Sequence, residues 1–88
     1  MYYLYVLKCA DGTLYTGIAL DVKKRVKEHN TSNVLGARYT RSRRPVYLVY
    51  SKKVGDEPTA KSAEYRFKQL SRVAKLALLK AGKQRKVA

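Results

Sequence analysis

Residues 2–19 read YYLYVLKCADGTLYTGIA, and this stretch decides the fold. Aromatic and branched side chains fill both of its halves, residues 2–9 and 14–19, and such side chains favour β-strands. Between the halves stands Ala10-Asp11-Gly12, which has the composition of a tight turn. The stretch therefore predicts a β-hairpin at the N-terminus.

The length of the hairpin connection is left open by the local sequence. Asp11-Gly12 can form a two-residue turn, and Ala10-Asp11-Gly12 can form a three-residue connection with Gly12 in a left-handed bulge. Side chains alternate along a strand with period two. The shorter connection places Tyr5 and Tyr15 on opposite faces of the sheet, and the longer one places them on the same face.

A helix is expected directly after the hairpin, over residues 22–29, with Asp21 as its N-cap. At 100° per residue, one arc of about 100° collects two apolar and two polar side chains. They are Val22, Arg25, Val26 and His29. Two polar groups therefore border the buried stripe of this helix.

The rest of the chain predicts one more strand and two more helices. Residues 30–44 are basic and lack periodicity, which indicates a surface loop, whereas residues 45–50, PVYLVY, predict a third strand. Residues 56–59, DEPT, begin a helix that should run to about residue 70, with Glu64 at the edge of its apolar face. A last helix should follow Ser71 and end at Gly82.

These elements predict an α/β (α+β) fold, in which about three helices flank a small three-stranded antiparallel sheet made of the hairpin and the third strand. A chain of 88 residues can build one hydrophobic core. We therefore expect a single domain over residues 1–82 and a basic tail over residues 83–88.

Charge makes a polyanion the expected partner. Twenty Lys and Arg residues oppose six Asp and Glu residues, for a net charge of +14. The basic residues are spread over several segments, which favours nucleic acid over a lipid surface. On charge alone, a ribosome-bound RNA protein fits as well.

Several functional classes lack the residues that they need. The single cysteine, Cys9, excludes an internal disulfide and a multi-cysteine zinc site, and is expected to be a small buried hydrophobic residue. The chain has one histidine and no glycine-rich phosphate loop. Without a signal peptide pattern or an apolar run of about 20 residues, we expect a cytoplasmic protein that does not contact a membrane.

The order of the remaining polar residues resembles the GIY-YIG endonuclease superfamily. Its two tyrosine motifs correspond to Tyr3-Leu4-Tyr5 and Tyr15-Thr16-Gly17, followed by the helix DVKKRVKEH and by Glu64 in a later helix. The chain is most similar to compact stand-alone bacterial members related to the structure-specific nucleases, which also carry segments like RYTRSRRPV and AEYRFKQLSR. The resemblance covers residues 3 to about 70.

The resemblance implies a metal-dependent DNA endonuclease. Tyr5 is the general base for the attacking water, with its phenolate stabilised by nearby cations, and Glu64 holds one divalent ion, Mg²⁺ or Mn²⁺. The other implied site residues are Tyr15, which orients phosphate or water, Arg25, which clamps phosphate, His29, which bonds Tyr5 or relays its proton, and Gly17, which allows close approach of the backbone. A site shared by Tyr5 and Tyr15 requires the three-residue hairpin connection.

Each of these residues also has a purely structural interpretation. Tyr5 can simply pack across the strands, His29 can be structural, and Glu64 can pair with Lys61 or Lys68 on its own helix. Relatives often add a second histidine and a late asparagine, which this chain lacks. A non-catalytic nucleic-acid-binding module of the same fold is therefore the alternative.

DNA is expected to lie along the basic loop. The expected contacts are Arg38, Tyr39, Arg41, Arg43 and Arg44, with Lys61 and Lys68 on the later helix. The arginines neutralise phosphates, and Tyr39 can stack on an unpaired base. A small domain without recognition modules favours single-stranded or branched DNA over plain duplex, and leaves the oligomeric state open.

Overall fold

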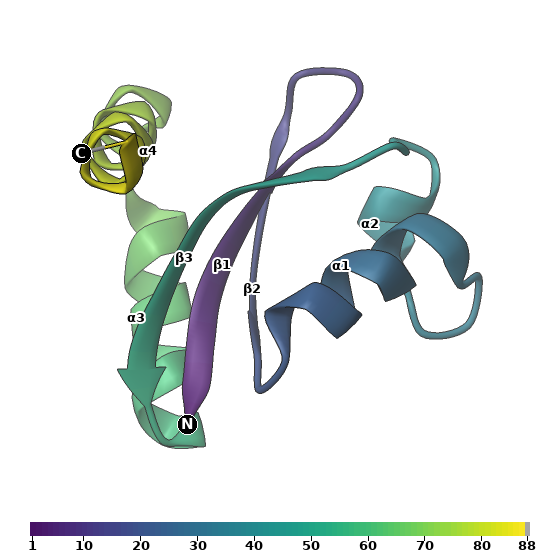
Figure 1. The fold of residues 1–88 in the computed structure, drawn as a ribbon, viewed down its shortest axis with the longest axis horizontal. Coiled ribbons are helices and arrows are strands. Elements are labelled where there is room, and N and C mark those ends of the chain that lie inside the picture. The colour runs from purple at the N-terminus through teal and green to yellow at the C-terminus, as the bar shows by residue number, and fades with distance from the viewer. Residues whose placement is uncertain (88) are drawn as a thin grey trace.

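A three-stranded antiparallel sheet forms the centre of the molecule (Figure 1). The computed structural model describes the backbone of residues 1–87 and the side chains of residues 1–80. Strands β1 (Tyr2–Lys8), β2 (Leu14–Ala19) and β3 (Tyr47–Gly55) lie in the order β2-β1-β3. The expected fold class is confirmed.

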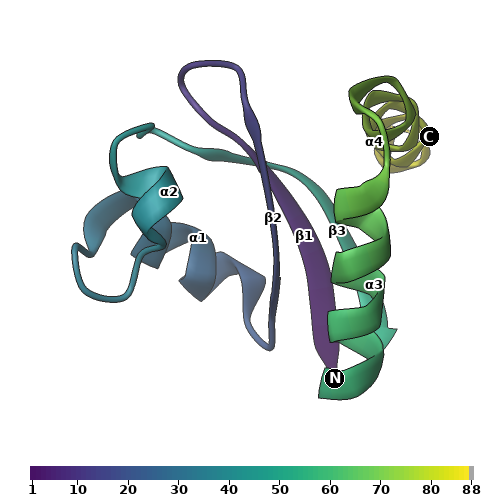
Figure 2. The same cartoon turned by 180° about the vertical axis from the view of Figure 1, so that it is seen from behind.

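Helices cover both faces of the sheet, as the two opposite views show (Figures 1 and 2). Helices α1 (Val22–Thr31) and α2 (Arg38–Arg41) lie on one side, and α3 (Glu57–Gln69) and α4 (Arg72–Val87) lie on the other. The central strand β1 is buried on both faces because its side chains alternate between two core clusters. Tyr5 and Leu7 face α1, whereas Leu4 and Val6 face α3 and α4.

The hairpin uses the three-residue connection. Cys9 N–H donates to the Thr13 carbonyl and Gly12 N–H donates to the Cys9 carbonyl, each at 2.9 Å, and Gly12 has φ of 85°. In this register Tyr5 lies opposite Gly17 and Leu7 lies opposite Tyr15. Tyr5 and Tyr15 therefore share a face, as predicted.

Helix α1 begins and faces the core as expected. The Asp21 carboxylate accepts a hydrogen bond from Lys24 N–H at 3.1 Å, and the helix continues two residues past the expected end, to Thr31. Val22 and Val26 pack against the cluster around Tyr5, and His29 is fully buried. Cys9 is buried in the same cluster, as predicted.

Two predictions about the middle of the chain are wrong. The segment expected to be a loop contains the single-turn helix α2, and β3 starts two residues late and extends to Gly55 instead of ending at residue 50. β3 is an edge strand whose second half, SKKVG, has few apolar side chains, so no alternating pattern marks it. α2 is too short for a helical periodicity and is held by contacts to α1.

The C-terminal helices follow the predicted start signals. Asp56 caps α3 by accepting from Thr59 N–H at 3.0 Å, and Ser71 Oγ accepts from Ala74 N–H at 3.2 Å at the start of α4. α4 passes through Gly82 to Val87, where an end at Gly82 was expected, because glycine inside a helix costs only about 1 kcal/mol. The side chains of the expected tail, residues 83–88, lie outside the part described. Among the described helices, none is both long and apolar enough to cross a membrane.

The left-handed conformation of Gly12 predicts a backbone effect on stability. Nothing lies within 4 Å of a Cβ added at Gly12, so a substitution there meets no steric neighbour. Gly12→Ala should lower the free energy of unfolding by about 1–2 kcal/mol, and Gly12→Asn by less, because asparagine tolerates positive φ. Denaturant unfolding measures both variants. Equal stability of Gly12→Ala and the parent would contradict the assigned loop.

Candidate active site

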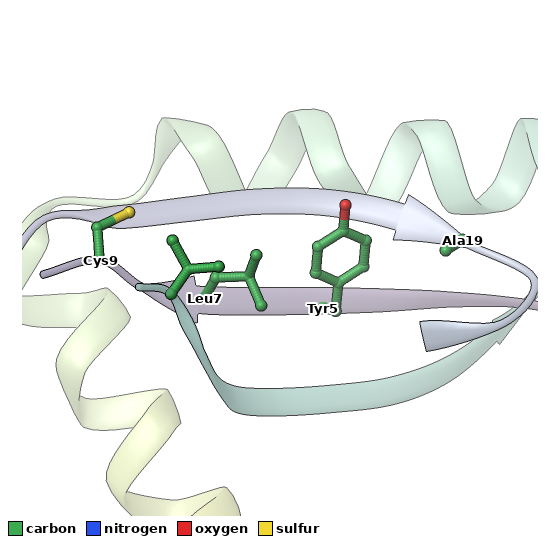
Figure 3. Close-up of a cluster of buried hydrophobic side chains, with 5 residues drawn as sticks. Tyr5, Leu7, Cys9 and Ala19 are labelled. Atoms are coloured by element: carbon green, nitrogen blue, oxygen red, sulfur yellow. The ribbon is translucent and has the colours of Figure 1, made fainter. Parts of the chain in front are cut away.

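Tyr5 lies at the centre of the sheet with its ring directed across β2 (Figure 3). Its side chain is 1% exposed, and it opposes Gly17 on β2. A Cβ atom added at Gly17 would lie 2.5 Å from the Tyr5 hydroxyl oxygen. Only glycine therefore lets the Tyr5 ring cover β2 at this point, and the group that approaches the Gly17 backbone is the Tyr5 ring.

A buried chain of hydrogen bonds joins β1, α1 and α2 through His29. The Tyr5 hydroxyl oxygen lies 2.8 Å from His29 Nε2, and Thr40 Oγ1 lies 2.9 Å from His29 Nδ1. His29 and Thr40 are both 0% exposed. The contact between Tyr5 and His29 that the resemblance implied is therefore present.

Tyr15 stands beside this pair and begins a stack that leads to the surface. Its ring packs edge-on against His29, with centroids 5.1 Å apart. The Tyr15 ring also stacks with the Tyr39 ring, with centroids 5.8 Å apart. The Arg43 guanidinium lies 3.9 Å from the Tyr39 ring centroid. Tyr39 thus contacts two side chains of the protein while it remains 38% exposed.

Arg25 is half-buried at the border of the site. Its Nη1 donates to Glu28 Oε1 at 3.0 Å and also to the Leu35 carbonyl. The positive charge of Arg25 lowers the pKa of both Tyr5 and His29. Arg25 is therefore close to both residues, with its own charge partly neutralised by Glu28.

Burial keeps both members of the Tyr5–His29 pair neutral. It raises the pKa of Tyr5 to about 12, with a further increase from Tyr15, and these effects exceed the lowering by Arg25. Burial also lowers the pKa of His29 to about 4, assisted by Arg25 and Arg44. Arg25 thus lowers the pKa of Tyr5, as expected of a nearby cation, but by less than burial raises it, and His29 is uncharged.

Glu64 lies on α3, behind the sheet as seen from α1. Its side chain is 24% exposed and its Oε2 lies 3.1 Å from Lys68 Nζ. The Glu64 carboxylate is nonetheless close enough to Tyr5 to contribute to raising the pKa of that phenol. Glu64 is thus not remote from Tyr5, although the pairing with Lys68 that we considered as its structural role is also present.

A metal ion would find one protein carboxylate here. Among residues 1–80, no three His, Cys, Asp or Glu side chains are grouped to hold a metal. A hard cation such as Mg²⁺ retains several waters and takes oxygen ligands from one or two carboxylates and from phosphate. Glu64 fits that donor set as a single oxygen ligand, whereas Glu28 is paired with Arg25.

Two of the arginines predicted to bind DNA are engaged within the protein. Arg44 binds the C-terminal end of α1, where Nε donates to the His29 carbonyl at 2.6 Å and Nη2 to the Ser32 carbonyl at 2.7 Å. Arg43 pairs with Asp11 at 3.1 Å. These contacts satisfy helix-end carbonyls and a carboxylate, so both arginines have structural roles that sequence reasoning missed.

The other predicted basic contacts are more exposed. Arg38 and Arg41 on α2 are exposed, with Arg41 donating to the Asn33 carbonyl at 2.9 Å. On α3, Lys61 pairs with Glu57 at 3.7 Å and Lys68 pairs with Glu64. Arg38 and Arg41 therefore remain as the accessible cations beside the site.

Sequence reasoning also missed residues that hold the site together. Thr40 contacts His29, and Asn30 exchanges two hydrogen bonds with the backbone of Val46, at 2.8 and 3.0 Å. A Cβ at Gly36 would lie 2.6 Å from the Ser32 carbonyl oxygen, so glycine is needed where the loop crosses the end of α1. No periodicity marks these residues, because their partners are far away in the sequence.

Comparison with known proteins finds chains of similar sequence and a structure of similar fold. The UPF0213 protein DP2720 of Desulfotalea psychrophila is 51% identical over 94% of this chain and 74% of its own length. The UPF0213 protein SAG0778 of Streptococcus agalactiae is 52% identical over 92% of this chain and 90% of its own length. The solution structure of the UPF0213 protein BH0048 of Bacillus halodurans superposes with a TM-score of 0.58 at 40% identity, covering 92% of this chain and 85% of that one.

The model of the GIY-YIG catalytic domain matches residues 1–77, which include both tyrosine motifs, the helix with Arg25 and His29, and the helix with Glu64. With this match over most of its length, the chain belongs to the GIY-YIG family.

Proposed function

We propose that this protein is a metal-dependent endonuclease that hydrolyses phosphodiester bonds in DNA. The GIY-YIG domain supports a nuclease-type function. The observation that carries the proposal is the buried Tyr5–His29 hydrogen bond of 2.8 Å, with Arg25 close to both rings. Such a pair of neutral groups beside a cation can accept and pass a proton where a phosphate binds.

Arg25 binds the scissile phosphate in this proposal. A guanidinium presents two N–H groups to the non-bridging oxygens, and phosphate is a stronger competitor than a half-exposed carboxylate. Glu28 would then release Arg25. Because the Arg25 charge lowers the pKa of His29, its neutralisation by phosphate makes His29 a better proton acceptor.

Tyr5 receives a proton from the attacking water and passes its own proton to His29 Nε2. The water oxygen bonds to phosphorus, the bond from phosphorus to the 3′ oxygen breaks, and the leaving oxygen takes a proton from solvent. Tyr15 orients the water or phosphate through its hydroxyl. Glu64 would hold the divalent ion, which supplies charge neutralisation at the phosphate when it is bound.

Single-stranded or branched DNA is the proposed substrate. Arg38 and Arg41 flank the site and are exposed, so they can contact phosphates. Unpaired strands can bend into a small site more easily than a stiff duplex.

A non-catalytic DNA-binding role is the second candidate. Both charges assigned to chemistry are neutralised inside the protein, Arg25 by Glu28 at 3.0 Å and Glu64 by Lys68 at 3.1 Å. The chain also lacks the second histidine and late asparagine of some relatives. Binding without turnover would satisfy all of these observations.

A cleavage assay separates the two candidates. Purified protein is incubated with labelled single-stranded, duplex and branched DNA in the presence of Mg²⁺ or Mn²⁺. We expect Glu64→Gln and Tyr5→Phe to lower the cleavage rate by roughly 10²-fold or more, because each removes a group that acts on the reacting atoms. Glu57→Gln is the matched control, since Glu57 also pairs with a lysine on α3 but lies at its exposed start.

Cleavage by all three variants at the parental rate would refute the site, and binding without cleavage by the parent would favour the second candidate.

The single histidine allows a direct test of the buried pair. We expect the His29 ring signal in the folded protein to titrate with a pKa of about 4 by NMR, because burial and Arg25 disfavour its charged form. In the unfolded chain the pKa is the ordinary 6.5. Below pH 6.5 the unfolded chain takes up a proton on His29 that the folded protein does not, so the folded state loses stability as the pH falls. Lowering the pH from about 7 to 5 should therefore cost roughly 2 kcal/mol of unfolding free energy. A His29 titration near the ordinary value would show that the ring is solvated.

Salt dependence distinguishes the exposed arginines from the structural ones. Arg38→Gln should reduce the slope of log affinity against log salt by about 0.7–0.9, because one phosphate contact is lost. Arg44→Gln should leave the slope nearly unchanged and lower stability, because its guanidinium caps α1. Titrations of a labelled single strand at several salt concentrations measure both. Equal changes in slope for the two variants would contradict the assignment.

A further inference from the structure

Thr40 is a buried polar residue to which the proposed reaction assigns no part. Its hydroxyl oxygen lies 2.9 Å from His29 Nδ1 and 2.9 Å from the Ala37 carbonyl oxygen. The side chain is 0% exposed, so water cannot replace either partner. The short helix α2 that carries Thr40 thus packs its hydroxyl against the imidazole that contacts Tyr5.

Counting protons distinguishes two arrangements of this network. The Ala37 carbonyl can only accept, so the Thr40 hydroxyl satisfies it by donating its single proton. Thr40 Oγ1 must then accept a proton from His29 Nδ1, which leaves Nε2 to accept from the Tyr5 hydroxyl. All three contacts of 2.8–2.9 Å become hydrogen bonds.

The opposite tautomer satisfies the network less well. It leaves Nδ1 to accept from Ala37 N–H at 3.3 Å, a longer contact. Thr40 can then donate to Nδ1 or to the Ala37 carbonyl but not to both, so one of its two 2.9 Å contacts has no proton between the atoms. A proton on Nδ1 removes the acceptor of Ala37 N–H, but it keeps the three contacts of 2.8–2.9 Å, so the shorter contacts favour the proton on Nδ1.

We propose that Thr40 is a positioning residue that fixes the His29 tautomer, so that the Tyr5 hydroxyl donates to a proton-free Nε2. The assignment of the tautomer depends only on the contacts of His29 and Thr40, whereas its effect on catalysis depends on the proposed nuclease function. Tyr5 then presents its oxygen lone pairs to the attacking water. As Tyr5 gains the proton of the water, its original O–H bond breaks and an Nε2–H bond forms, while Nδ1–H stays bonded to Thr40.

Substitution of Thr40 reverses the tautomer in this account. Thr40→Val has nearly the same shape but no hydroxyl, so Ala37 N–H becomes the remaining partner of Nδ1 and the proton moves to Nε2. The Ala37 carbonyl still accepts from the backbone N–H groups of Thr40 and Arg41 at 3.1 and 3.2 Å. Thr40→Ser retains the hydroxyl and is the matched control.

Long-range ¹H–¹⁵N NMR reads the tautomer directly, because the chain has one histidine and its two ring nitrogens differ in shift when one carries the proton. We expect protonated Nδ1 in the parent and in Thr40→Ser, and protonated Nε2 in Thr40→Val. A proton on Nε2 in the parent would overturn the proposal even if Thr40→Val does not fold. An unchanged tautomer in folded Thr40→Val would overturn it as well.

Cleavage kinetics test the catalytic consequence separately. Thr40→Val should lower kcat by about 10- to 100-fold with unchanged DNA affinity, and Thr40→Ser should restore most of the rate, because only proton transfer is affected. Loss of DNA affinity in parallel with kcat, or failure of Thr40→Ser to recover, would instead assign Thr40 a structural role. If the NMR results hold and the parent cuts no DNA, the positioning of His29 stands and the nuclease proposal fails.

Discussion

The hydrogen bond between the Tyr5 hydroxyl and His29 Nε2 holds together segments that are 24 residues apart in the sequence. Both groups are buried, so loss of either partner would leave an unsatisfied polar atom. This bond forms only when three conditions are met together. The hairpin register must place Tyr5 opposite Gly17, Gly17 must lack a side chain, and α1 must be rotated so that His29 faces the sheet. The site is thus built into the hydrophobic core on the α1 face of the sheet.

The cores on the two faces of the sheet differ in polarity. On the α3 and α4 face, Leu4 and Val6 pack against Phe67 and Leu79 in an apolar cluster. On the α1 face, the core includes a phenol and contacts an imidazole, and burial keeps both neutral. The Tyr5–His29 pair thus avoids the cost of burying an isolated charge in a chain of net charge +14.

Much of the positive charge next to the site serves the fold. Arg44 binds carbonyls at the end of α1, Arg43 bridges to Asp11, and Arg25 pairs with Glu28. These contacts hold the segment between α1 and β3 close to the sheet, with α2 and Thr40 against His29. The basic composition therefore overstates the number of side chains available to DNA, because an arginine can satisfy helix ends as well as phosphates.

The sequence by itself determined the elements whose signals are local. Aromatic and branched side chains on both sides of Ala10-Asp11-Gly12 predict the hairpin, and the spacing of Arg25 and His29 predicts that both border the buried stripe of α1. The positions of Thr40, Arg44 and Asn30 could not be predicted in this way, because their partners lie 11 to 16 residues away and no period links them. Only the tertiary structure decided that burial favours the neutral forms of Tyr5 and His29 and that Arg43 and Arg44 bond to other groups of the protein, because burial and hydrogen-bond partners depend on how the packed elements meet.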